Sequence, residues 1–431
     1  MLDDIDGPDP WRRLTAIYII DRVKHWSSRA WLAVNSAAAF QRQGGRSIVA
    51  VDMNEGEEWR ARLLNKTRMK PDLIIDHARR EGLDEFQTFE FGGKHPYVYT
   101  PRYWRAVARL ARVVEEESVD VLHVFRRTHI LTACAVASIS KRPVAVVTTC
   151  PRSDRTLRNR FPHVLLHRRL DAVISFSQQM AQANKRVRGV APAISHEVPA
   201  GLPPIFTDVV HPREPARRAL CRMAGVDGAP LIGMLGDVEH EKCNHNLVYA
   251  AGMLREKLPG LRVLIIGDAI KKAASKYDLH RIIDEEGLED IVRMMPPVPA
   301  DQVPRVIAGL DIALYLSCRS SGPSRSMLEY CSQGTPTVAT DVGAVPEYHR
   351  RDRRAFRMIP FKQVPPVAEA VEDIWRNPSM RTEMSRRGRA LVMNHFTFDL
   401  LGWRLRTIYE GCLRRRGIPA PGAVAAGRLR A

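Results

Sequence analysis

The chain has 431 residues, 45% of them hydrophobic, which is enough for two domains of ordinary size with buried cores. Its 66 Lys and Arg residues outnumber 48 Asp and Glu residues, and the formal charge of +18 favours anionic partners unless it only reflects a GC-rich genome. No apolar run reaches the roughly 18 residues that a membrane-spanning helix needs, and the acidic N-terminus lacks the apolar core of a signal peptide.

The first half of the chain alternates apolar runs with helical patterns. The continuous apolar run 14–20 predicts a buried parallel strand, followed by a helix over 29–43 and a second strand over 47–51. Further elements are predicted at 59–64 (helix), 73–75 (strand), 101–117 (helix), 119–124, 144–149 and 170–177 (strands). This βαβ pattern predicts a Rossmann-like parallel sheet.

The second half repeats the pattern after a hinge marked by Pro203, Pro204 and Pro212, whose fixed φ makes the connection stiff. Strands are predicted at 231–236, 261–267, 291–295, 312–316 and 337–340. Helices are predicted at 213–224, 246–258, 279–286, 301–310, 324–332, 365–375, 379–394 and 396–415. The remainder, 417–431, is rich in Ala, Gly, Pro and Arg and is predicted to be disordered. The seven cysteines include no C-x-x-C pair, which indicates reduced thiols in the cytoplasm.

The stretch 316–347 carries the strongest functional signal. A polar Ser/Gly loop, which includes Gly322, opens the helix predicted to begin at Ser324. Such a loop presents free backbone N–H groups and the positive end of the helix dipole, which suits a phosphate or diphosphate. Glu329, about one and a half turns into the helix, is placed to accept hydrogen bonds from ribose hydroxyls. The alternative is an ordinary βαβ unit with a solvated glutamate.

This stretch resembles the donor-nucleotide motif of glycosyltransferase family 4 (group 1), the retaining enzymes of GT-B fold. The matching positions are Gly322, Glu329, Gly334, Pro336, Val338, Ala339, Thr340, Gly343 and Glu347. Residues 119–124 resemble the Asp-Val-Val-His strand of the same family, and the resemblance covers about 14–415. It implies an α/β GT-B architecture, two Rossmann-like parallel-sheet domains facing across a cleft. The expected parts are an acceptor-side domain (1–203), a nucleotide-sugar domain (204–395), a helix crossing back to the first domain (396–415) and a disordered tail (416–431).

The resemblance implies hexosyl transfer from a nucleotide-sugar to an acceptor, with retention at the anomeric carbon. Lys242 matches the family's diphosphate lysine, and the donor-binding set is expected to comprise Lys242, Gly322, Ser324, Arg325 and Glu329. Ser321 is a candidate contact for the donor sugar, and the candidate acceptor or anion contacts are Ser27, Ser28, Arg126 and Arg152. No catalytic residue is identified. No cofactor or metal is expected, because relatives neutralise the diphosphate with protein groups.

Four functional positions depart from the family pattern. Ser321 replaces a glutamate, Asp237 replaces an arginine, Thr149 and Cys150 stand where many relatives have a histidine, and Ser27 and Ser28 replace a glycine pair. These departures leave open a non-catalytic GT-B-like module that binds a nucleotide or a partner. A nucleotide-sugar 2-epimerase is a further alternative, but its acidic groups and histidines are not found in place. A nucleic-acid binder is permitted by the charge, but no aromatic-plus-basic recognition motif supports it, and no nucleic acid is expected.

The expected partners of a working enzyme follow from its charge and its family. They are a nucleotide-sugar, a lipid-linked or phosphorylated acceptor, and an anionic membrane surface. The predicted location is cytoplasmic, peripheral at the inner membrane face, in the synthesis of cell-surface polysaccharide or glycolipid.

Overall fold

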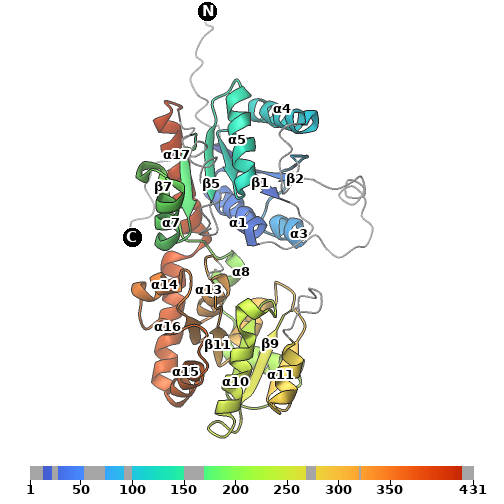
Figure 1. The fold of residues 1–431 in the computed structure, drawn as a ribbon, viewed down its shortest axis with the longest axis vertical. Coiled ribbons are helices and arrows are strands. Elements are labelled where there is room, and N and C mark those ends of the chain that lie inside the picture. Colours follow the sequence, from blue (N-terminus) through green and yellow to red (C-terminus); the bar gives the residue numbers. More distant parts are fainter. Residues whose placement is uncertain are drawn as a thin grey trace, which may run out of the picture. The chain divides into compact units, whose positions relative to one another are not determined.

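A computed structural model describes residues 13–21, 28–52, 73–91, 100–149, 169–267, 278–319 and 322–419. The chain divides into two compact units, which are described separately. Unit 1 combines Met1–Gly201 with Phe398–Ala431, and unit 2 is Leu202–Thr397. Each unit is built around one parallel sheet with helices packed on its faces (Figure 1). Among the described residues, no helix combines the length and the apolar character that crossing a membrane requires.

Unit 1 contains a seven-stranded sheet in the order β3-β2-β1-β4-β5-β6-β7. Its strands are β1 (Thr15–Asp21), β2 (Arg46–Asp52), β3 (Phe86–Phe89), β4 (Val121–Val124), β5 (Ala145–Thr149), β6 (Ala172–Ser175) and β7 (Ser195–Glu197). Its helices are α1 (Ser28–Arg42), α3 (Leu73–Arg80), α4 (Pro101–Glu116), α5 (Arg127–Ile139), α7 (Gln178–Arg188) and α17 (Phe398–Arg415). All strand pairs are parallel, with Ile17 of β1 opposite both Ile48 and Leu122.

Unit 2 contains a six-stranded sheet in the order β10-β9-β8-β11-β12-β13. Its strands are β8 (Leu231–Leu235), β9 (Arg262–Ile266), β10 (Val292–Met295), β11 (Ile312–Tyr315), β12 (Thr337–Thr340) and β13 (Arg357–Ile359). Its helices are α8 (Pro204–Thr207), α9 (Arg213–Ala224), α10 (Asn244–Leu254), α11 (Leu279–Glu285), α12 (Val303–Ala308), α13 (Arg325–Ser332), α14 (Val345–Arg351), α15 (Pro365–Arg376) and α16 (Pro378–His395).

Both sheets have a topological switch point. In unit 1 the chain moves outward from β1 to β3, then returns to the other side of β1 with β4. In unit 2 it moves from β8 to β10, then returns beside β8 with β11. The helices that follow neighbouring strands at such a point start at the same sheet edge and diverge, which is where open α/β sheets bind ligands. Each of the two switch points is therefore an expected ligand-binding position.

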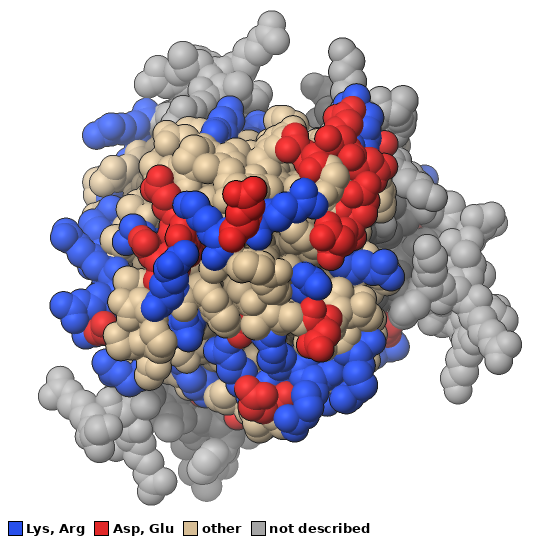
Figure 2. Space-filling model, turned by 90° about the horizontal axis from the view of Figure 1, so that it is seen from below, with Lys and Arg blue, Asp and Glu red and all other residues tan. Residues whose placement is uncertain are grey.

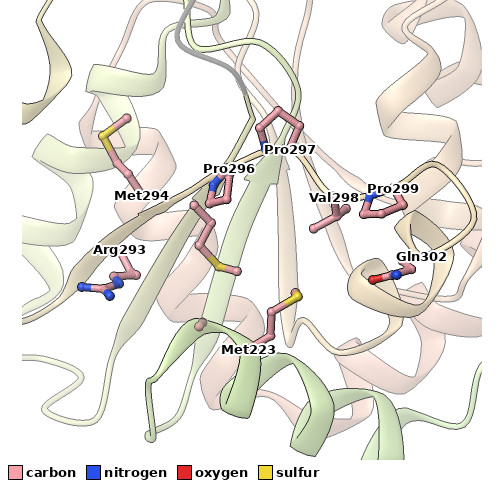
Figure 3. Close-up of a pocket in the computed structure, with 10 residues that line it drawn as sticks. Met223, Arg293, Met294, Pro296, Pro297, Val298, Pro299 and Gln302 are labelled. Atoms are coloured by element: carbon pink, nitrogen blue, oxygen red, sulfur yellow. The ribbon is translucent and has the colours of Figure 1, made fainter. Parts of the chain in front are cut away.

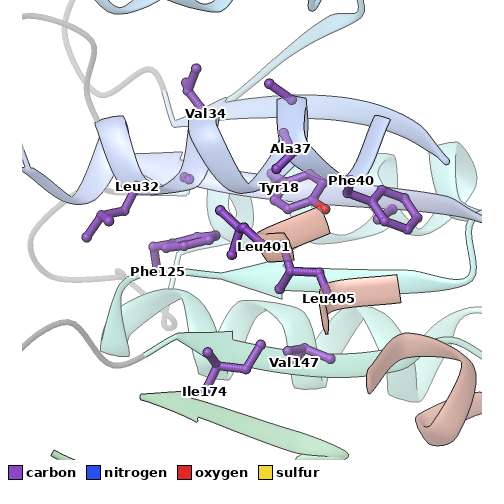
Figure 4. Close-up of a cluster of buried hydrophobic side chains, with 14 of the residues drawn as sticks. Tyr18, Leu32, Val34, Ala37, Phe40, Phe125, Val147, Ile174, Leu401 and Leu405 are labelled. Carbon is purple, nitrogen blue, oxygen red and sulfur yellow. The ribbon is translucent and has the colours of Figure 1, made fainter. Parts of the chain in front are cut away.

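Helix α17, the last helix of the chain, is an integral part of unit 1. Its buried residues Leu401, Leu405 and Tyr409 recur at helical spacing and join the core formed with α1 and the sheet, as Figure 4 shows around Tyr18 and Phe40. The two helices approach closely at Gly402, where a Cβ atom would lie only 2.0 Å from the carbonyl oxygen of Ala39.

The described elements agree with most of the predicted ones to within a few residues. The predicted helix 213–224 coincides with α9, and the predicted strand and helix at 312–316 and 324–332 appear as β11 and α13. The short strand predicted at 73–75 is wrong, because these residues begin α3. Their three apolar side chains are followed by Asp76 in the first turn and basic residues in the last turn, a charge order that suits the helix dipole. Residues 59–64 and 420–431 lie outside the described part of the chain.

Candidate functional site

A small cavity lies at the switch point of unit 2, between the carboxyl ends of β8 and β11. Its volume is about 20 Å³. The strands and their exits contribute Met234, Leu235, Gly236, Asp237, Leu314, Tyr315, Leu316 and Ser317, and the helices and their entry contribute Lys242, Asn244, Ser326 and Tyr330. Two helix N-termini, those of α10 and α13, therefore meet beside one cavity.

The α10 side supplies one cation and one anion. Lys242 is half-buried and Asp237 is exposed, and within the described residues neither forms an ion pair. Cys243 caps α10 in the left-handed region at φ 51°, and its side chain makes no capping hydrogen bond. The side chain of the cap residue therefore accepts no hydrogen bond from the backbone N–H groups in the first turn of α10.

Helix α13 also begins after a cap residue in the left-handed region whose side chain makes no capping hydrogen bond. Gly322 has a φ of 89°, and Ser324 caps the helix at φ 49° without a side-chain capping bond. Ser324 is 1% exposed, and its hydroxyl has no hydrogen-bond partner among the residues that the structure describes. Tyr348 fixes the loop that precedes α13 by donating a 2.9 Å hydrogen bond to the carbonyl of Pro323. A buried, unpartnered hydroxyl at a helix N-terminus is a feature that a bound anion would satisfy.

Glu329 and Arg325 form an ion pair one turn apart on α13. Arg325 Nε lies 3.0 Å from Glu329 Oε1, and the glutamate side chain is 11% exposed. Burial raises the pKa of Glu329, and the charge of Arg325 offsets part of this rise. Arg325 is thus engaged with the carboxylate that the sequence assigns to the ribose.

Tyr330, which follows Glu329 on α13, ties the helix to the end of β8. Its hydroxyl accepts a hydrogen bond of 2.9 Å from Leu235 N and donates one of 3.2 Å to Leu235 O. Its side chain also lines the cavity, together with Asn244 and Ser326. The sequence identified none of these three residues as part of the site, because no local pattern marks the side chains that line a cavity between two strands.

The candidate acceptor residues belong to unit 1, and the structure describes only part of this set. Ser28 begins α1, and Arg126 is the N-cap of α5, so both stand at helix starts beside the β1–β4 switch point. Ser27, Cys150 and Arg152, as well as Ser321 of unit 2, lie outside the described residues.

His123 is a buried histidine that contacts Thr149, and Thr149 stands where many relatives have a histidine. His123 of β4 makes hydrogen bonds of 2.7 Å with Thr149 Oγ1 and 2.6 Å with Tyr409 Oη. Burial lowers the pKa of His123 to about 3, so the imidazole is neutral. Thr149 therefore serves a buried polar chain that continues through Tyr409 to Tyr18, 3.1 Å away.

A second cavity, of about 290 Å³, lies beside the edge strand β10 of unit 2 (Figure 3). Met223 of α9 stands on one side, and residues 293–299 line the other. Arg293 and Gln302 supply the polar side chains of a lining that is otherwise Met, Pro, Val and Ala. It shares no lining residue with the switch-point cavity.

Residues 224–391 match the family model described as glycosyl transferases group 1. Over 170 residues the chain is 27% identical to a 2-deoxystreptamine glucosyltransferase of Streptomyces kanamyceticus, an alignment covering 39% of this chain and 42% of that protein. Over 173 residues it is 25% identical to the lipopolysaccharide core biosynthesis glycosyltransferase LpsE of Rhizobium meliloti, covering 40% of this chain and 47% of that protein. The chain thus spans less than half the length of these two relatives.

Solved structures extend the similarity to nearly the whole chain, at the level of fold. Anabaena Alr3699/HepE, solved in complex with UDP, matches with a TM-score of 0.74 and 14% identity over 93% of this chain and 100% of its own. The same protein has been solved with UDP-glucose. The chain therefore has the GT-B fold, and its residues 224–391 carry the sequence pattern of the group 1 glycosyl transferases.

Proposed function

We propose that the chain is a retaining glycosyltransferase that binds a nucleotide-sugar at the switch point of unit 2. One observation carries the proposal. The N-terminus of α13, with the unpartnered buried hydroxyl of Ser324, opens beside a cavity that Lys242 also lines. Both features stabilise negative charge, and a sugar nucleotide has two phosphates to place there.

The chemistry follows from where charge develops. As the glycosidic bond to the diphosphate breaks, negative charge grows on the leaving phosphate and positive charge grows on the sugar ring. Lys242 and the N–H groups at the start of α13 would stabilise the leaving group, while Glu329 would hold the ribose. These are protein groups, so the proposal includes transfer that needs no metal or other cofactor.

Uridine donors are the first to test. The similar HepE structures contain UDP or UDP-glucose, although their 14 to 16% identity carries only the fold to this chain. One relative is named a 2-deoxystreptamine glucosyltransferase and another a lipopolysaccharide core biosynthesis glycosyltransferase, and the second name supports a glycolipid as acceptor class. Our proposal for this chain is a lipid-linked or phosphorylated acceptor of cell-surface glycan synthesis, used by a cytoplasmic protein at the membrane face.

A non-catalytic nucleotide-binding module is the second candidate, and two observations favour it. The switch-point cavity holds only about 20 Å³, and Tyr330 lines it. Asp237 adds a negative charge to the same lining, which opposes a diphosphate.

The discriminating experiment is turnover followed by NMR. The purified protein is incubated with UDP-, GDP- and ADP-sugars, with and without EDTA, and the anomeric configuration of any released or transferred sugar is read from its proton couplings. Our proposal predicts nucleoside diphosphate release with retained configuration, unchanged by EDTA. Nucleotide binding without release, also when a lipid extract is added as the source of acceptor, would favour the module instead, and an inverted product would contradict retention.

A further inference from the structure

Two cysteines lie next to the switch-point cavity of unit 2, each beside a residue that lines it. Cys243, 2% exposed, is the residue in the left-handed region that caps α10. Cys318, half-buried, follows β11 on the way to α13. Cys318 packs against the hydrophobic core that contains Cys243, the two thiols lie within interaction distance of each other, and neither sulfur is part of a disulfide.

The backbone holds the two cysteine segments together independently of the thiols. Cys318 N donates a 3.0 Å hydrogen bond to the carbonyl of Glu241, and Ser317 Oγ donates one of 3.3 Å to the same carbonyl. Arg319 Nη1 adds a contact of 2.5 Å with Glu241 Oε1. The two backbone segments that carry the cysteines therefore lie side by side whatever rotamers the thiols adopt.

Each cysteine directly follows, in the sequence, a residue that lines the cavity. Lys242 precedes Cys243, and Ser317 precedes Cys318. A covalent bond between the sulfurs would draw them closer than two thiols in hydrogen-bond contact, and it would shift these two neighbours. The sulfur pair is thus coupled to the place where we propose that the diphosphate binds.

We infer that Cys243 and Cys318 form a reversible disulfide that weakens nucleotide binding at the switch point of unit 2. The binding part of this inference rests on the proposed function, whereas disulfide formation does not.

The reaction is a thiol–disulfide exchange with a low-molecular-weight disulfide such as glutathione disulfide. Cys318, the more exposed thiol, attacks as its thiolate and releases one glutathione thiol, which leaves a mixed disulfide on Cys318 Sγ. Cys243 then attacks Cys318 Sγ as its thiolate and releases the second glutathione thiol. The protein thiols lose two protons and two electrons, and the two glutathione molecules gain them.

The burial of Cys243 sets the order of the two steps. Burial, followed by the hydrogen bond with Cys318, raises the pKa of Cys243 to about 12. Its thiolate is therefore scarce, and the external disulfide reacts with Cys318 first. The second step is helped by the contact between the two sulfurs.

The test treats the full chain with glutathione disulfide, blocks the remaining thiols with an alkylating agent and maps the peptides by mass spectrometry. Cys318→Ser removes the pair, and Cys221→Ser is the matched control because Cys221 is a half-buried thiol on α9 of the same unit. Linked peptides that contain Cys243 and Cys318 are expected in the wild type and in Cys221→Ser, and their absence there would overturn the disulfide. A glutathione adduct that stays on Cys318 would overturn it as well.

Nucleotide affinity is then compared between the reduced and oxidised wild type, with UDP as the probe. We expect oxidation to lower the affinity about tenfold, equivalent to about 1.4 kcal/mol, and a reducing thiol to restore it. The affinity of Cys318→Ser should not respond to either treatment. Equal affinity in the oxidised and reduced wild type would refute the coupling, whereas failure of the reduced protein to bind UDP, GDP or ADP would count against the proposed function.

Discussion

At the switch point of unit 2, the close approach of two backbone segments leaves no room for a side chain at Gly267. Gly267, at the end of β9, approaches β8 so closely that a Cβ atom would lie 1.8 Å from the carbonyl oxygen of Gly236. Gly236 in turn lines the cavity beside Asp237. The absence of a side chain at Gly267 therefore fixes the path of the backbone into the candidate site.

The variant Gly267→Ala should destabilise unit 2 by about 1–3 kcal/mol and weaken nucleotide binding, because backbone atoms must move to admit the methyl group. Gly252→Ala is the control. Gly252 lies in helix α10, and its added Cβ would lie 3.7 Å from Leu288 Cδ1, an ordinary van der Waals distance. There alanine should leave stability unchanged or raise it by up to about 1 kcal/mol. Denaturant unfolding of both variants measures the difference, and equal effects would contradict the steric reading.

Aspartates just before strands fasten neighbouring strands at the amino ends of both sheets. Asp120 accepts a 2.9 Å hydrogen bond from Thr15 N, and Asp171 accepts one of 2.7 Å from Val146 N. In unit 2, Asp311 accepts one of 2.7 Å from Leu231 N and pairs with Arg213 and Arg217 of α9. One buried carboxylate thus joins two strands to a helix.

Asp311→Ala should lower the stability of unit 2 by about 3 kcal/mol, because it leaves the partly buried Arg217 and a backbone donor without their partner. Asp290→Ala is the matched control, since Asp290 pairs with Arg255 at the surface, where both side chains are more than 40% exposed. Its removal should change stability by less than about 1 kcal/mol. Thermal unfolding of the two variants tests this ranking, and similar midpoints would show that the buried carboxylate is dispensable.

At the scale of elements, helix α17 is joined to the sheet of unit 1 by a buried polar chain. Tyr409 of α17 bonds His123 of β4 and Tyr18 of β1, and His123 also bonds Thr149 of β5. Because His123 is neutral in this chain, its protonation opposes folding.

The stability of unit 1 should therefore fall as the pH drops. Burial lowers the pKa of His123 to about 3, whereas an unfolded histidine takes up its proton near pH 6.5. This contribution is fully present above about pH 6.5 and is lost as the pH falls toward 3, by about 1.4 kcal/mol between pH 7.5 and 5.5.

The measurement is the urea concentration at which peptides of α17 lose protection from hydrogen exchange, at both pH values. His123→Gln lowers stability overall, but its loss between pH 7.5 and 5.5 should be smaller than that of the wild type by the same about 1.4 kcal/mol. An identical pH dependence in both proteins would show that His123 does not titrate as its burial requires.

The sequence predicted those elements in which one periodicity dominates. Continuous apolar runs became β1, β8 and β9, and the amphipathic pattern of 396–415 became α17. The sequence did not predict β3, β7 and β13, which have three or four residues, nor the helices α5, α7 and α14. Residues 73–75, predicted as a strand, begin helix α3. Three apolar residues in a row do not distinguish a strand from the first turn of a helix.

The candidate site was predictable only where a motif fixed the backbone. The helix start at Ser324 and the position of Glu329 about one and a half turns into the helix followed from the resemblance and from helix geometry. The clamp of Tyr330 on Leu235 depends on neighbouring strands and on a side-chain rotamer, which no local pattern encodes. The contact between Cys243 and Cys318 joins residues 75 positions apart and arises only because β8 and β11 are neighbours.

At the scale of the whole molecule, the surplus of 18 positive charges exists beside many surface ion pairs, which are themselves neutral. Figure 2 shows Lys and Arg side chains interspersed with Asp and Glu on one face of the molecule. Surface pairs such as Lys257–Glu372 and Arg354–Glu383 belong to this pattern. The surplus of positive charge still favours anionic surfaces at low salt, where screening is weak.

The proposed membrane partner yields a prediction of its own. The protein should sediment with vesicles that contain anionic lipid at low salt, and much less so when added salt shortens the Debye length to about 8 Å. Vesicles of neutral lipid are the control and should bind little. Equal sedimentation with both kinds of vesicle, or none at low salt, would argue against an electrostatic membrane contact.

Calorimetric binding of UDP and of inorganic pyrophosphate tests the proposed donor site at the switch point of unit 2. Lys242 is assigned to the diphosphate and Glu329 to the ribose, so Lys242→Ala should weaken both ligands about tenfold or more, equivalent to at least about 1.4 kcal/mol. Glu329→Gln should weaken UDP by a similar factor and leave pyrophosphate unchanged. If UDP binds the wild type and neither substitution alters its affinity, the nucleotide does not bind at the switch point of unit 2, and the proposed donor site is wrong.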